Sequence, residues 1–526
     1  MRELMRLVCI RTFALTTMVL FGTEGVSRCE NASLPSSPAQ PAGSAAAKKT
    51  APLFVNATDY PDLQAAVDAV AFKGGTVYLP PGEYKLTKPL NLADRYNSGD
   101  KTRFITLQGS GMLTTTISGD FPGNVIVDLT HSGYMTLRDL TITGHAKCMV
   151  LCARKNNEGG GNHLFENVAL KGSDCTVAVA LMASECDRFY NCQITVEKPE
   201  AVGVLFSARN DYAIKSPYSE AGGGSNTELR FYGCIIHSFG QNSVGLKIQG
   251  SANDVSIFGG YFCNRGLASI YLDGATGNVG DVLIDGVRIE GAGGLYCLYA
   301  KGAVRNVTME GCTFASGGEV IRYDSATFKN TAAEGWRIAH CSLALQGEIS
   351  TDKLGSSTAE LYRSPDGERA IFRMEKLLNS RFENNWIRAY QASSGAVTTA
   401  NAPTENAAQL PFTRRVQWYV PRTLICSGEA KGNTFTVGNS DEVQLRGPSY
   451  GNRLEALDDG GVRRTYLGAG NGADLINLTP MDVTKIRTPH VGDLAIDSGN
   501  LHRDGKLRLV YFDGKTWVSS VGDAAR

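Results

Sequence analysis

The sequence predicts an all-β protein built as a parallel β-helix, and three observations lead to this fold. A motif of short apolar strands around a small or Asn residue recurs along the chain. Glycine contributes 59 of the 526 residues, which implies many turns and short elements. No segment of helical periodicity separates the repeats. A single coil of this kind cannot bury its apolar face, whereas stacked coils can.

The repeat is defined by its turn residue, which recurs at a period of roughly 25 residues with longer gaps where segments are inserted. The predicted turn positions are Asn167, Asn191, Gly233, Gly259, Gly286, Gly311, His340 and Asn384. A further strand precedes each motif, as in VGVLFSA, VGLKIQG, ASIYLDG, YCLYAKG and EVIRYDS. Each unit therefore holds three short strands, and we expect a three-sheet solenoid of about ten coils.

The cysteines follow the same repeat. Of the 13 cysteines, four share the position just after the turn: Cys192, Cys234, Cys312 and Cys341. We expect an inward stack of small apolar side chains there. Disulfides between adjacent coils are the less favoured alternative. The spacing matches no zinc motif.

The two ends of the chain carry different signals. Residues 1–28 hold a basic start and a short apolar run, which predict a signal peptide and a secreted, periplasmic or cell-surface protein. A mis-assigned start or a disordered tail is the alternative. Residues 29–52 are a Pro/Ala/Ser linker expected to be disordered. No segment of the mature chain is expected to cross a membrane, because the apolar run is too short.

Residues 53–440 are expected to form the β-helix domain. Its first part predicts a helix with apolar residues at helical spacing (Leu63, Ala66, Val67 and Val70), Pro61 in the first turn and Gly74-Gly75 as the stop. This helix is expected to cap the open end of the stack. Residues 441–526 are expected to form a small C-terminal capping β module with a hairpin at Asp513-Gly514.

LQAAVDAVAFKGGTVYLPPGEYKLTKPLNL, FITLQGSG, TTTISG and the coils that follow resemble the pectin-lyase-like superfamily, within it the rhamnogalacturonase/epimerase-like pectate lyase domains. The resemblance implies a right-handed parallel β-helix and a polysaccharide substrate, often an acidic one. It also implies an active cleft on the first sheet of the coil. The N-x-D, D-D, G-H-G and R-x-K series of the polygalacturonase type is absent from the coils, so no catalytic set carries over.

The first sheet corresponds to VGLKIQG and its equivalents. Strand alternation sends Leu246 and Ile248 inward, so Lys247 and Gln249 point outward. Aligned units give two outward columns. The first holds Ala180, Leu205, Lys247, Tyr271, Tyr299 and Arg322, and the second holds Met182, Ser207, Gln249, Asp273, Lys301 and Asp324. Both columns are apolar or small at first, then charged and aromatic.

These columns supply the candidate site. The candidate catalytic residues are Lys247, Tyr271, Asp273, Tyr299, Lys301, Arg322 and Asp324. The candidate substrate-binding residues are Gln249 and, from an insertion at 209–227, Tyr212, Lys215 and Tyr218. Tyr rings stack on sugars, and Lys or Arg bind uronate carboxylates. The plainer alternatives are a solvated sheet face and a tolerated surface loop.

Two mechanisms compete for these residues, with β-elimination preferred. A lyase needs a cation for the uronate carboxylate (Arg322 or Lys247), and an acid and a base (Tyr271, Tyr299 or Lys301). An inverting hydrolase needs two separated carboxyl groups. Asp273 and Asp324 stand two strand steps apart, ~9.6 Å, which suits inversion. A non-catalytic glycan-binding or tail-spike-like protein is the third alternative.

The sequence gives few signals for a metal site, for binding partners or for the oligomeric state. Asp285 and Glu310 are expected to stack on the second sheet, where they would either bind a cation or raise one pKa. Two carboxylates are few for Ca²⁺, so no metal site is assigned. Lys+Arg and Asp+Glu both number 52, which argues against a nucleic-acid partner. A monomer or a homotrimer is expected.

Overall fold

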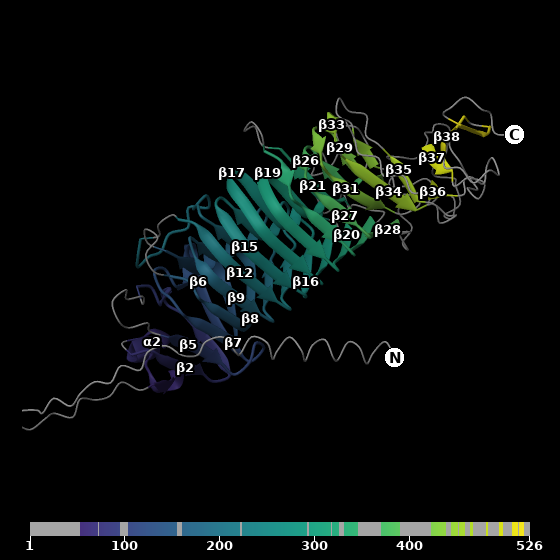
Figure 1. Cartoon of the computed structure of the whole chain (residues 1–526). Helices are drawn as coiled ribbons and strands as arrows, with labels where there is room; N and C mark the ends of the chain where they lie inside the picture. Colours follow the sequence, from purple (N-terminus) through teal and green to yellow (C-terminus); the bar gives the residue numbers. More distant parts are fainter. Residues whose placement is uncertain are drawn as a thin grey trace, which may run out of the picture. The chain divides into compact units, whose positions relative to one another are not determined.

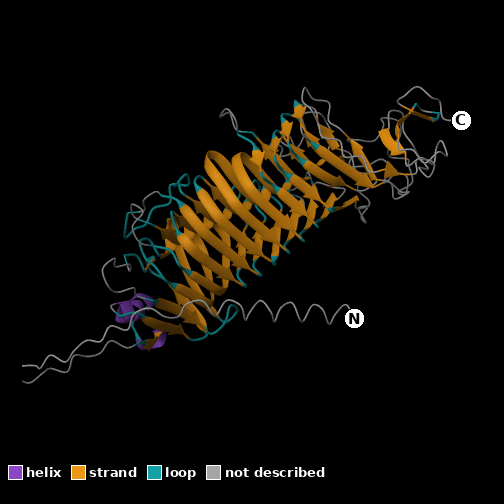
Figure 2. Cartoon of the chain, in the orientation of Figure 1, coloured by secondary structure: helices purple, strands orange, loops and turns teal. Residues whose placement is uncertain are grey.

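The structure is a computed structural model, and a defined part of the chain is described. The described residues are 53–71, 73–94, 104–154, 160–220, 224–291, 294–316, 318–325, 331–345, 370–389, 422–437, 443–445, 447–450, 452–457, 463–466, 480–481, 494–497, 508–513 and 515–519. Within them the chain is almost entirely β-strand, with one α-helix, α2 (Leu63–Ala71), and a 3-10 turn, η1 (Ala57–Asp59) (Figure 2). The predicted signal peptide and linker lie outside the described residues.

Stacked coils of parallel strands form the body of the fold, as Figure 1 shows. Each strand pairs in parallel with its equivalent in the next coil, so three sheets run along the stack. Parallel pairing between successive coils, with three strands per coil, defines a parallel β-helix. The fold class expected from the repeat is therefore confirmed.

The three sheets have the following strands, several of which turn the corner from one sheet into the next. The first sheet holds β4 (Leu90–Asn91), the ends of β6 (Thr115–Asp128), β7 (Thr136–Ala153) and β8 (Leu164–Met182), then β11 (Val202–Ser207), β14 (Val244–Gln249), the starts of β17 (Ala268–Asp285) and β19 (Tyr296–Glu310), β21 (Glu319–Asp324), β25 (Ala370–Met374), β29 (Arg422–Cys426) and β32 (Val443–Leu445). The second sheet holds β1 (Phe54–Asn56), β2 (Gly75–Leu79), β5 (Ile105–Gly109), the starts of β7 and β8, β9 (Glu185–Tyr190), β12 (Asn226–Tyr232), β15 (Ala252–Phe258), the ends of β17 and β19, β22 (Ala333–Glu334), β23 (Arg337–Ala339), β26 (Leu377–Leu378), β27 (Arg381–Glu383), β30 (Ala430–Lys431), β31 (Thr434–Val437), β33 (Ser449–Tyr450) and β34 (Arg453–Leu457). The third sheet holds β3 (Gly82–Lys85), the start of β6, the middle parts of β7 and β8, β10 (Gln193–Val196), β13 (Ile235–Ser238), β16 (Tyr261–Asn264), β18 (Arg288–Gly291), β20 (Thr313–Ser316), β24 (Ser342–Leu345) and β28 (Trp386–Ala389).

The turn between the second and third sheets is where the sequence repeat was most visible. All eight predicted turn residues have a left-handed backbone, with φ between 50° and 63°. Gly accepts this conformation freely, and Asn accepts it better than most residues. Two Asn side chains also bond along the stack, because Asn191 Nδ2 donates to Asn167 Oδ1 at 2.8 Å. The repeat therefore marks a backbone requirement of the coil.

The core is the inside of the stack, where equivalent side chains lie on top of one another. Phe165, Phe189 and Phe231 stack with ring centroids 4.4 and 4.9 Å apart. Cys192 and Cys234 on neighbouring coils are buried free thiols, as are Cys312 and Cys341. Apolar, unbridged cysteines at this position agree with the expected inward stack.

The helix α2 buries Leu63, Ala66, Val67 and Val70 in the same core as the coils. The helix begins at Leu63. Pro61 therefore precedes the first turn, whereas the sequence analysis predicted it within that turn. Asp62 provides the cap, since its Oδ1 accepts from the Ala65 backbone N–H at 2.7 Å. Gly74 stands at the predicted stop with φ +80°, a conformation that glycine adopts readily. A Cβ at this position would also lie 2.8 Å from the Phe104 carbonyl oxygen, so a larger residue would clash.

The C-terminal strands form two arrangements. β35 (Arg463–Tyr466) pairs antiparallel with β34. β36 (Pro480–Met481), β37 (Leu494–Asp497), β38 (Arg508–Phe512) and β39 (Trp517–Ser519) form a separate small sheet. The predicted hairpin is present, with Phe512 opposite Trp517 in an antiparallel pair. The proposed domain boundary near residue 440 falls outside the described residues.

Candidate functional site

The outer face of the first sheet has the register that the sequence predicted. Strand pairing places Ala180, Leu205, Lys247, Tyr271, Tyr299 and Arg322 in one column and Met182, Ser207, Gln249, Asp273, Lys301 and Asp324 in the next. Neighbouring members lie one strand spacing apart, ~4.8 Å. The seven candidate catalytic residues therefore share one face over four consecutive strands, β14, β17, β19 and β21.

The apolar start of both columns is covered by the inserted segment 209–220. Ala180, Leu205 and Met182 are at most 1% exposed and form a second apolar cluster with Ile214 of the insertion. Tyr212 packs at the edge of this cluster. These outward side chains are apolar because they lie beneath a second layer of chain. The insertion thus closes one part of the face and leaves the charged part without this cover.

The insertion is fastened to coils far away in the sequence. Ser216 Oγ donates to Asp128, Tyr218 Oη donates to the Pro89 carbonyl, and Ser219 Oγ donates to Asp94 Oδ1 at 3.0 Å. Asp128 is buried, and this burial raises its pKa. Side-chain and backbone bonds from Ser216 and Thr130 act in the opposite direction. The segment is therefore built into the fold and is held along the first sheet.

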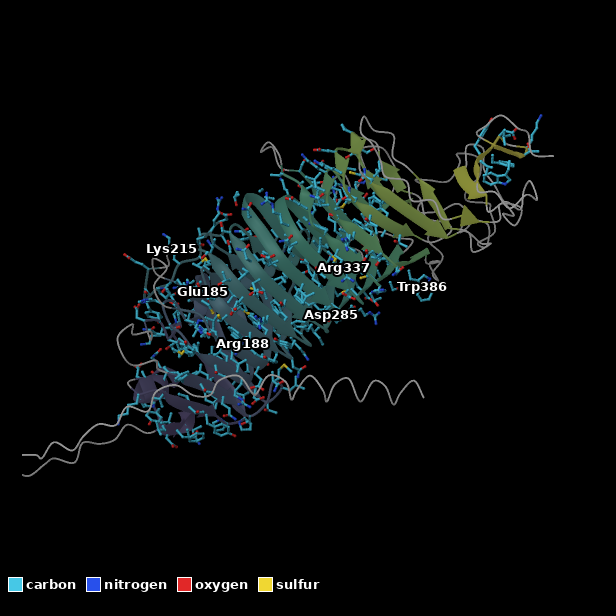
Figure 3. All side chains as sticks on the ribbon, in the orientation of Figure 1. Glu185, Arg188, Lys215, Asp285, Arg337 and Trp386 are labelled. Atoms are coloured by element: carbon cyan, nitrogen blue, oxygen red, sulfur yellow. The ribbon has the colours of Figure 1, made fainter. Side chains whose placement is uncertain are left out.

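Of the four candidate substrate-binding residues, Gln249 and Tyr218 form hydrogen bonds within the protein, whereas Lys215 is exposed. Gln249 is 1% exposed, with Nε2 donating to Ser207 Oγ at 2.8 Å and to Asp211 Oδ2 at 3.2 Å. Tyr218 is directed to the coil of Pro89. Lys215, labelled in Figure 3, is exposed. Tyr212 alone reaches the charged part of the face, where Lys247 contacts it.

Lys247 lies at the border between the covered and charged parts. Its Nζ is 3.6 Å from Asp273 Oδ2 and 3.5 Å from Tyr212 Oη, and it sits over the rings of Tyr212 and Tyr271 at 5.4 and 5.3 Å. The side chain is 14% exposed. Burial lowers the pKa of Lys247, although Asp273 and Asp211 oppose this shift. A lysine with a lowered pKa can act as a base more readily than an ordinary one.

Three tyrosines form a packed row beyond Lys247. The rings of Tyr271 and Tyr299 stack at 4.8 Å, and those of Tyr296 and Tyr299 at 5.2 Å. Burial raises the pKa of all three hydroxyls, that of Tyr296 to about 12. Because the ring faces lie against each other and against Lys247, they offer a ligand mainly edges and hydroxyl groups. The sequence-based expectation of sugar stacking on these faces therefore fits this packing poorly.

Asp324 accepts hydrogen bonds from two neighbouring side chains. Arg322 Nε donates to Oδ1 and Tyr299 Oη donates to Oδ2, each at 2.8 Å. Arg322 Nη1 also donates to Tyr296 Oη at 3.3 Å and lies 3.7 Å from Glu319 Oε2. The guanidinium of Arg322 is thus occupied by groups of the protein itself, which disfavours its predicted role as the binder of a substrate carboxylate.

Lys301 is a cation of this face without a polar partner in the described part of the chain. It lies between Asp273 and Asp324 in the second column and is partly exposed. Among the described residues its ammonium forms no hydrogen bond or ion pair, whereas both flanking carboxylates have their own cations. Lys301 is therefore the side chain best placed to bind an incoming anionic group.

Glu319 and Arg373 belong to the same network and were missed by the sequence reasoning. Glu319 is 4% exposed and pairs with Arg373, which is 6% exposed. Burial raises the pKa of Glu319, opposed by Arg373. Arg373 lies on β25, and its register partner on the neighbouring strand β21 is Arg322.

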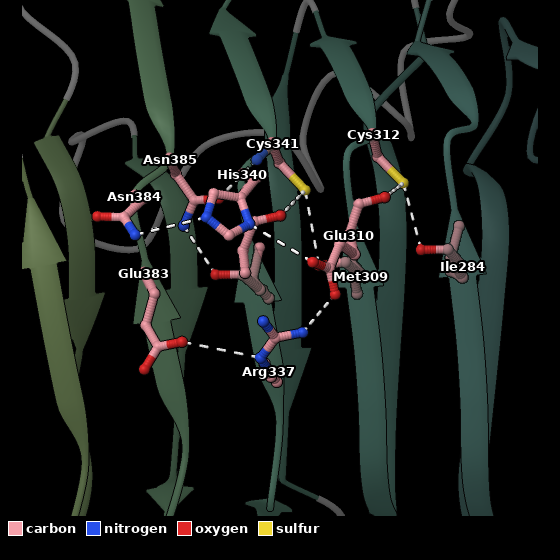
Figure 4. A network of polar contacts seen from close by, with 12 residues as sticks. Ile284, Met309, Glu310, Cys312, Arg337, His340, Cys341, Glu383, Asn384 and Asn385 are labelled. Atoms are coloured by element: carbon pink, nitrogen blue, oxygen red, sulfur yellow. Dashed lines mark hydrogen bonds and ion pairs between the residues drawn. The ribbon is translucent and has the colours of Figure 1, made fainter. Parts of the chain in front are cut away.

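The second acidic pair is real, but its chemistry differs from the expectation. Asp285 and Glu310 are register partners on the second sheet. Glu310 accepts from Arg337 Nη1 at 2.5 Å and lies 3.5 Å from His340 Nδ1, as Figure 4 shows. The hydrogen bond from Arg337 lowers the pKa of Glu310, so the predicted raised pKa is wrong for this residue. Glu310 is paired with Arg337.

In the described part of the chain, no group of three or more His, Cys, Asp or Glu side chains lies close enough to hold a metal ion. No helix there is both long and apolar enough to cross a membrane.

Comparison with known proteins gives structural likenesses only. No family model matches the chain. No curated protein matches it either. A mannuronan C-5 epimerase AlgE6 A-module of Azotobacter vinelandii is 15% identical over 65% of this chain and 96% of its own, with a TM-score of 0.40. ORF18 of Geobacillus virus E2 is 12% identical over 89% and 86%, with a TM-score of 0.39. The Dettilon tailspike protein is 14% identical over 64% and 68%, also with a TM-score of 0.39. The fold assignment rests on the strand pairing of this chain.

Proposed function

We propose that the charged part of the first sheet binds an acidic, uronate-containing polysaccharide and cleaves it by β-elimination. The observation that carries the proposal is Lys301, a partly exposed cation that has no hydrogen bond or ion pair among the described residues and lies between two carboxylates with cations of their own. An anionic sugar unit supplies the charge that Lys301 lacks. The resemblance of the sequence to pectin-lyase-like proteins supports the same class of substrate.

Each step of the elimination has a candidate residue on this face. Lys301 binds the uronate carboxylate and stabilises the negative charge that develops on it. Lys247, whose pKa is lowered by burial, takes the proton α to that carboxylate. The electron pair of the broken C–H bond forms the double bond, and the glycosidic oxygen leaves. Tyr271 or Tyr299, protonated because burial raises their pKa, donates a proton to that oxygen.

Inverting hydrolysis is the second candidate, and the spacing of Asp273 and Asp324 favours it. Two strand steps separate these carboxylates, ~9.6 Å between backbones, which suits a water between base and acid. However, hydrolysis needs one carboxyl group to be protonated. Arg322 and Tyr299 both donate hydrogen bonds to Asp324, and Lys247 Nζ lies 3.6 Å from Asp273 Oδ2, so both carboxyl groups are already engaged by donors of the protein itself. This ranks hydrolysis below elimination.

The test is incubation of the full chain with a panel of polyuronates and with a neutral polysaccharide as control. A new ultraviolet absorbance from unsaturated uronate ends, together with new reducing ends, is the expected result. Reducing ends without that absorbance would replace elimination by hydrolysis. Binding of polyuronate without any cleavage would replace both by a glycan-binding role. Secretion and the oligomeric state stay predictions, to be checked by fractionation and by light scattering.

A further inference from the structure

A cluster of arginine and tyrosine side chains with few polar partners among the described residues lies on the outer face of the second sheet. Arg188 on β9 and Arg230 on β12 are direct register partners, so two guanidinium groups occupy neighbouring strands. Arg188, labelled in Figure 3, is exposed and has no side-chain partner among the described residues. Among the described residues Arg230 has one ion pair, with Glu228 at 3.9 Å. Like charges on neighbouring strands repel, and in the described part of the chain this single carboxylate is the counter-ion of the two guanidinium groups.

An aromatic row runs beside the two arginines. Tyr190, Tyr232 and Phe258 stack with ring centroids 4.5 and 5.3 Å apart and interplanar angles of 8° and 16°. Tyr190 is 37% exposed. Neither tyrosine hydroxyl has a hydrogen-bond partner among the described residues. Stacked rings turn their edges outward, and the edge of an aromatic ring carries the positive end of its quadrupole.

The strip presents mainly hydrogen-bond donors and positive ring edges, with the Glu228 carboxylate beside Arg230. Two guanidinium forks, two phenol hydroxyls and three ring edges face outward within three coils. Carboxylates lie at both ends of the aromatic row, Glu166 before Tyr190 and Asp285 after Phe258. Glu166 has its own cation, Arg138, at 3.7 Å. The strip therefore accommodates one or two anionic groups and repels a longer run of them at Asp285.

We infer that the strip of Arg188, Arg230, Tyr190 and Tyr232 is a second, non-catalytic binding site for the anionic sugar units of an acidic polysaccharide. Arginine forks match the planar geometry of a carboxylate, and the phenol hydroxyls donate to ring oxygens and hydroxyl groups of the sugar. The two arginines are one strand spacing apart, ~4.8 Å, similar to the length of a sugar unit. The ligand class is that of the proposed function, but binding here requires no catalysis.

The strip is on a different sheet from Lys301, so it acts as a separate anchor for the polymer. A chain held at a second site has a higher effective concentration at the first, which favours long polymers over short ones. The strip is expected to lower KM for long substrates and to leave the cleavage of short oligomers unchanged.

The experiment is calorimetric titration of the full chain with an oligogalacturonate and an oligomannuronate of one length, with a neutral oligogalactoside as control. The strip variant is Arg188→Gln/Arg230→Gln. The matched control is Arg305→Gln/Arg337→Gln, which removes two arginines of the same sheet that have their own carboxylates at 3.2 and 2.5 Å. Both are also made in a Lys301→Ala background, which weakens the first-sheet site and isolates the strip.

In the Lys301→Ala background we expect the strip variant to weaken uronate binding at least about tenfold, while the control variant does not. Tyr190→Phe/Tyr232→Phe, which removes only the hydroxyls, is expected to weaken it about two- to fivefold. Unchanged binding in the strip variant overturns the inference whether or not the protein cleaves polyuronates. Equal competition by inorganic phosphate or sulfate reduces the strip to a simple anion site and overturns the sugar assignment. Cleavage assays on the same variants test the proposed function separately.

Discussion

Two stretches of the first sheet occupy the same position in the repeat and have opposite surroundings. On β8 and β11 the outward side chains, among them Ala180 and Leu205, are buried under the inserted segment 209–220. On β14, β17, β19 and β21 the same columns hold Lys247, Asp273, Lys301 and other polar groups. The register is unbroken between the two stretches. The composition of an outward column therefore reports whether another layer of chain covers it.

The comparison also locates the candidate chemistry. Lys247 stands where the cover ends, next to Tyr212 at the edge of the insertion. Partial burial at this border lowers the pKa of Lys247 and raises that of Tyr212 to about 12. Ala180, Leu205 and Met182 beneath the insertion are apolar, whereas the side chains of Asp273 and Asp324 beyond it are each 19% exposed. The border is where a titratable group is desolvated and still accessible, which is the usual setting of catalytic acids and bases.

Exchanging residues between the two stretches is expected to have the largest effect. Leu205 and Lys247 are register partners. Leu205→Lys places an unpaired ammonium group under Ile214 and should lower the free energy of unfolding by about 3–5 kcal/mol in urea titrations. Lys247→Leu removes an ion pair whose side chains are 14% and 19% exposed, and should lower the free energy of unfolding by less than Leu205→Lys does, because Asp273 keeps some access to water. Equal losses from the two variants would remove the distinction between covered and open stretches.

Loss of the free cation is the next largest effect. Lys301→Ala is expected to lower kcat/KM on a polyuronate about 100-fold, with unfolding nearly unchanged, because the ammonium group forms no hydrogen bond or ion pair with any described residue. Lys171→Ala, an exposed lysine on the third sheet, serves as the matched control. Full activity in Lys301→Ala would place the reaction elsewhere on the molecule.

The border position of Lys247 predicts a pH dependence. Because burial lowers its pKa in the folded chain, the neutral amine forms at a lower pH than the ordinary lysine value of about 10.4. The elimination rate should therefore rise with pH and level off below that value. Stability should rise with pH over the same window, since the unfolded chain binds the proton more tightly there. A Lys247→Ala variant that kept the same rising limb would assign the base to another group.

The smallest expected effect on stability concerns the hydrogen bonds that hold the inserted segment 209–220 on the first sheet. Ser207 Oγ accepts from Gln249 Nε2 and from the Arg209 backbone N–H at 2.8 and 2.9 Å. Ser207→Ala leaves both donors short of a partner and should cost about 1–2 kcal/mol of stability. Proteolysis within 209–220 should become faster, whereas Ser342→Ala, on the third sheet, should leave it unchanged. Unaltered proteolysis would show that the contacts of Ser216 and Tyr218 hold the segment by themselves.

Much of the fold was accessible from the repeat, because each coil imposes the same local demands. The predicted turn residues all have a left-handed backbone, and both outward columns pair as aligned. The burial of part of the first sheet under segment 209–220 was not predicted, although apolar residues at outward positions, such as Ala180 and Leu205, indicated it. Its contacts join residues far apart along the chain, such as Tyr218 with Pro89. Arg373 was missed because a long segment separates its strand from Asp324, so the period could not be counted across it.

The sequence by itself determined the parallel β-helix, the turn positions and the face on which each strand residue lies. These depend on local backbone geometry and on alternation, which repeat from coil to coil. Only the tertiary structure decided which outward residues face solvent and which cations are already paired. Burial and ion pairing depend on segments brought together from distant parts of the chain, as with Gln249 under Asp211 and Arg322 beside Glu319. Lys301 became the leading candidate only when the partners of its neighbours were known.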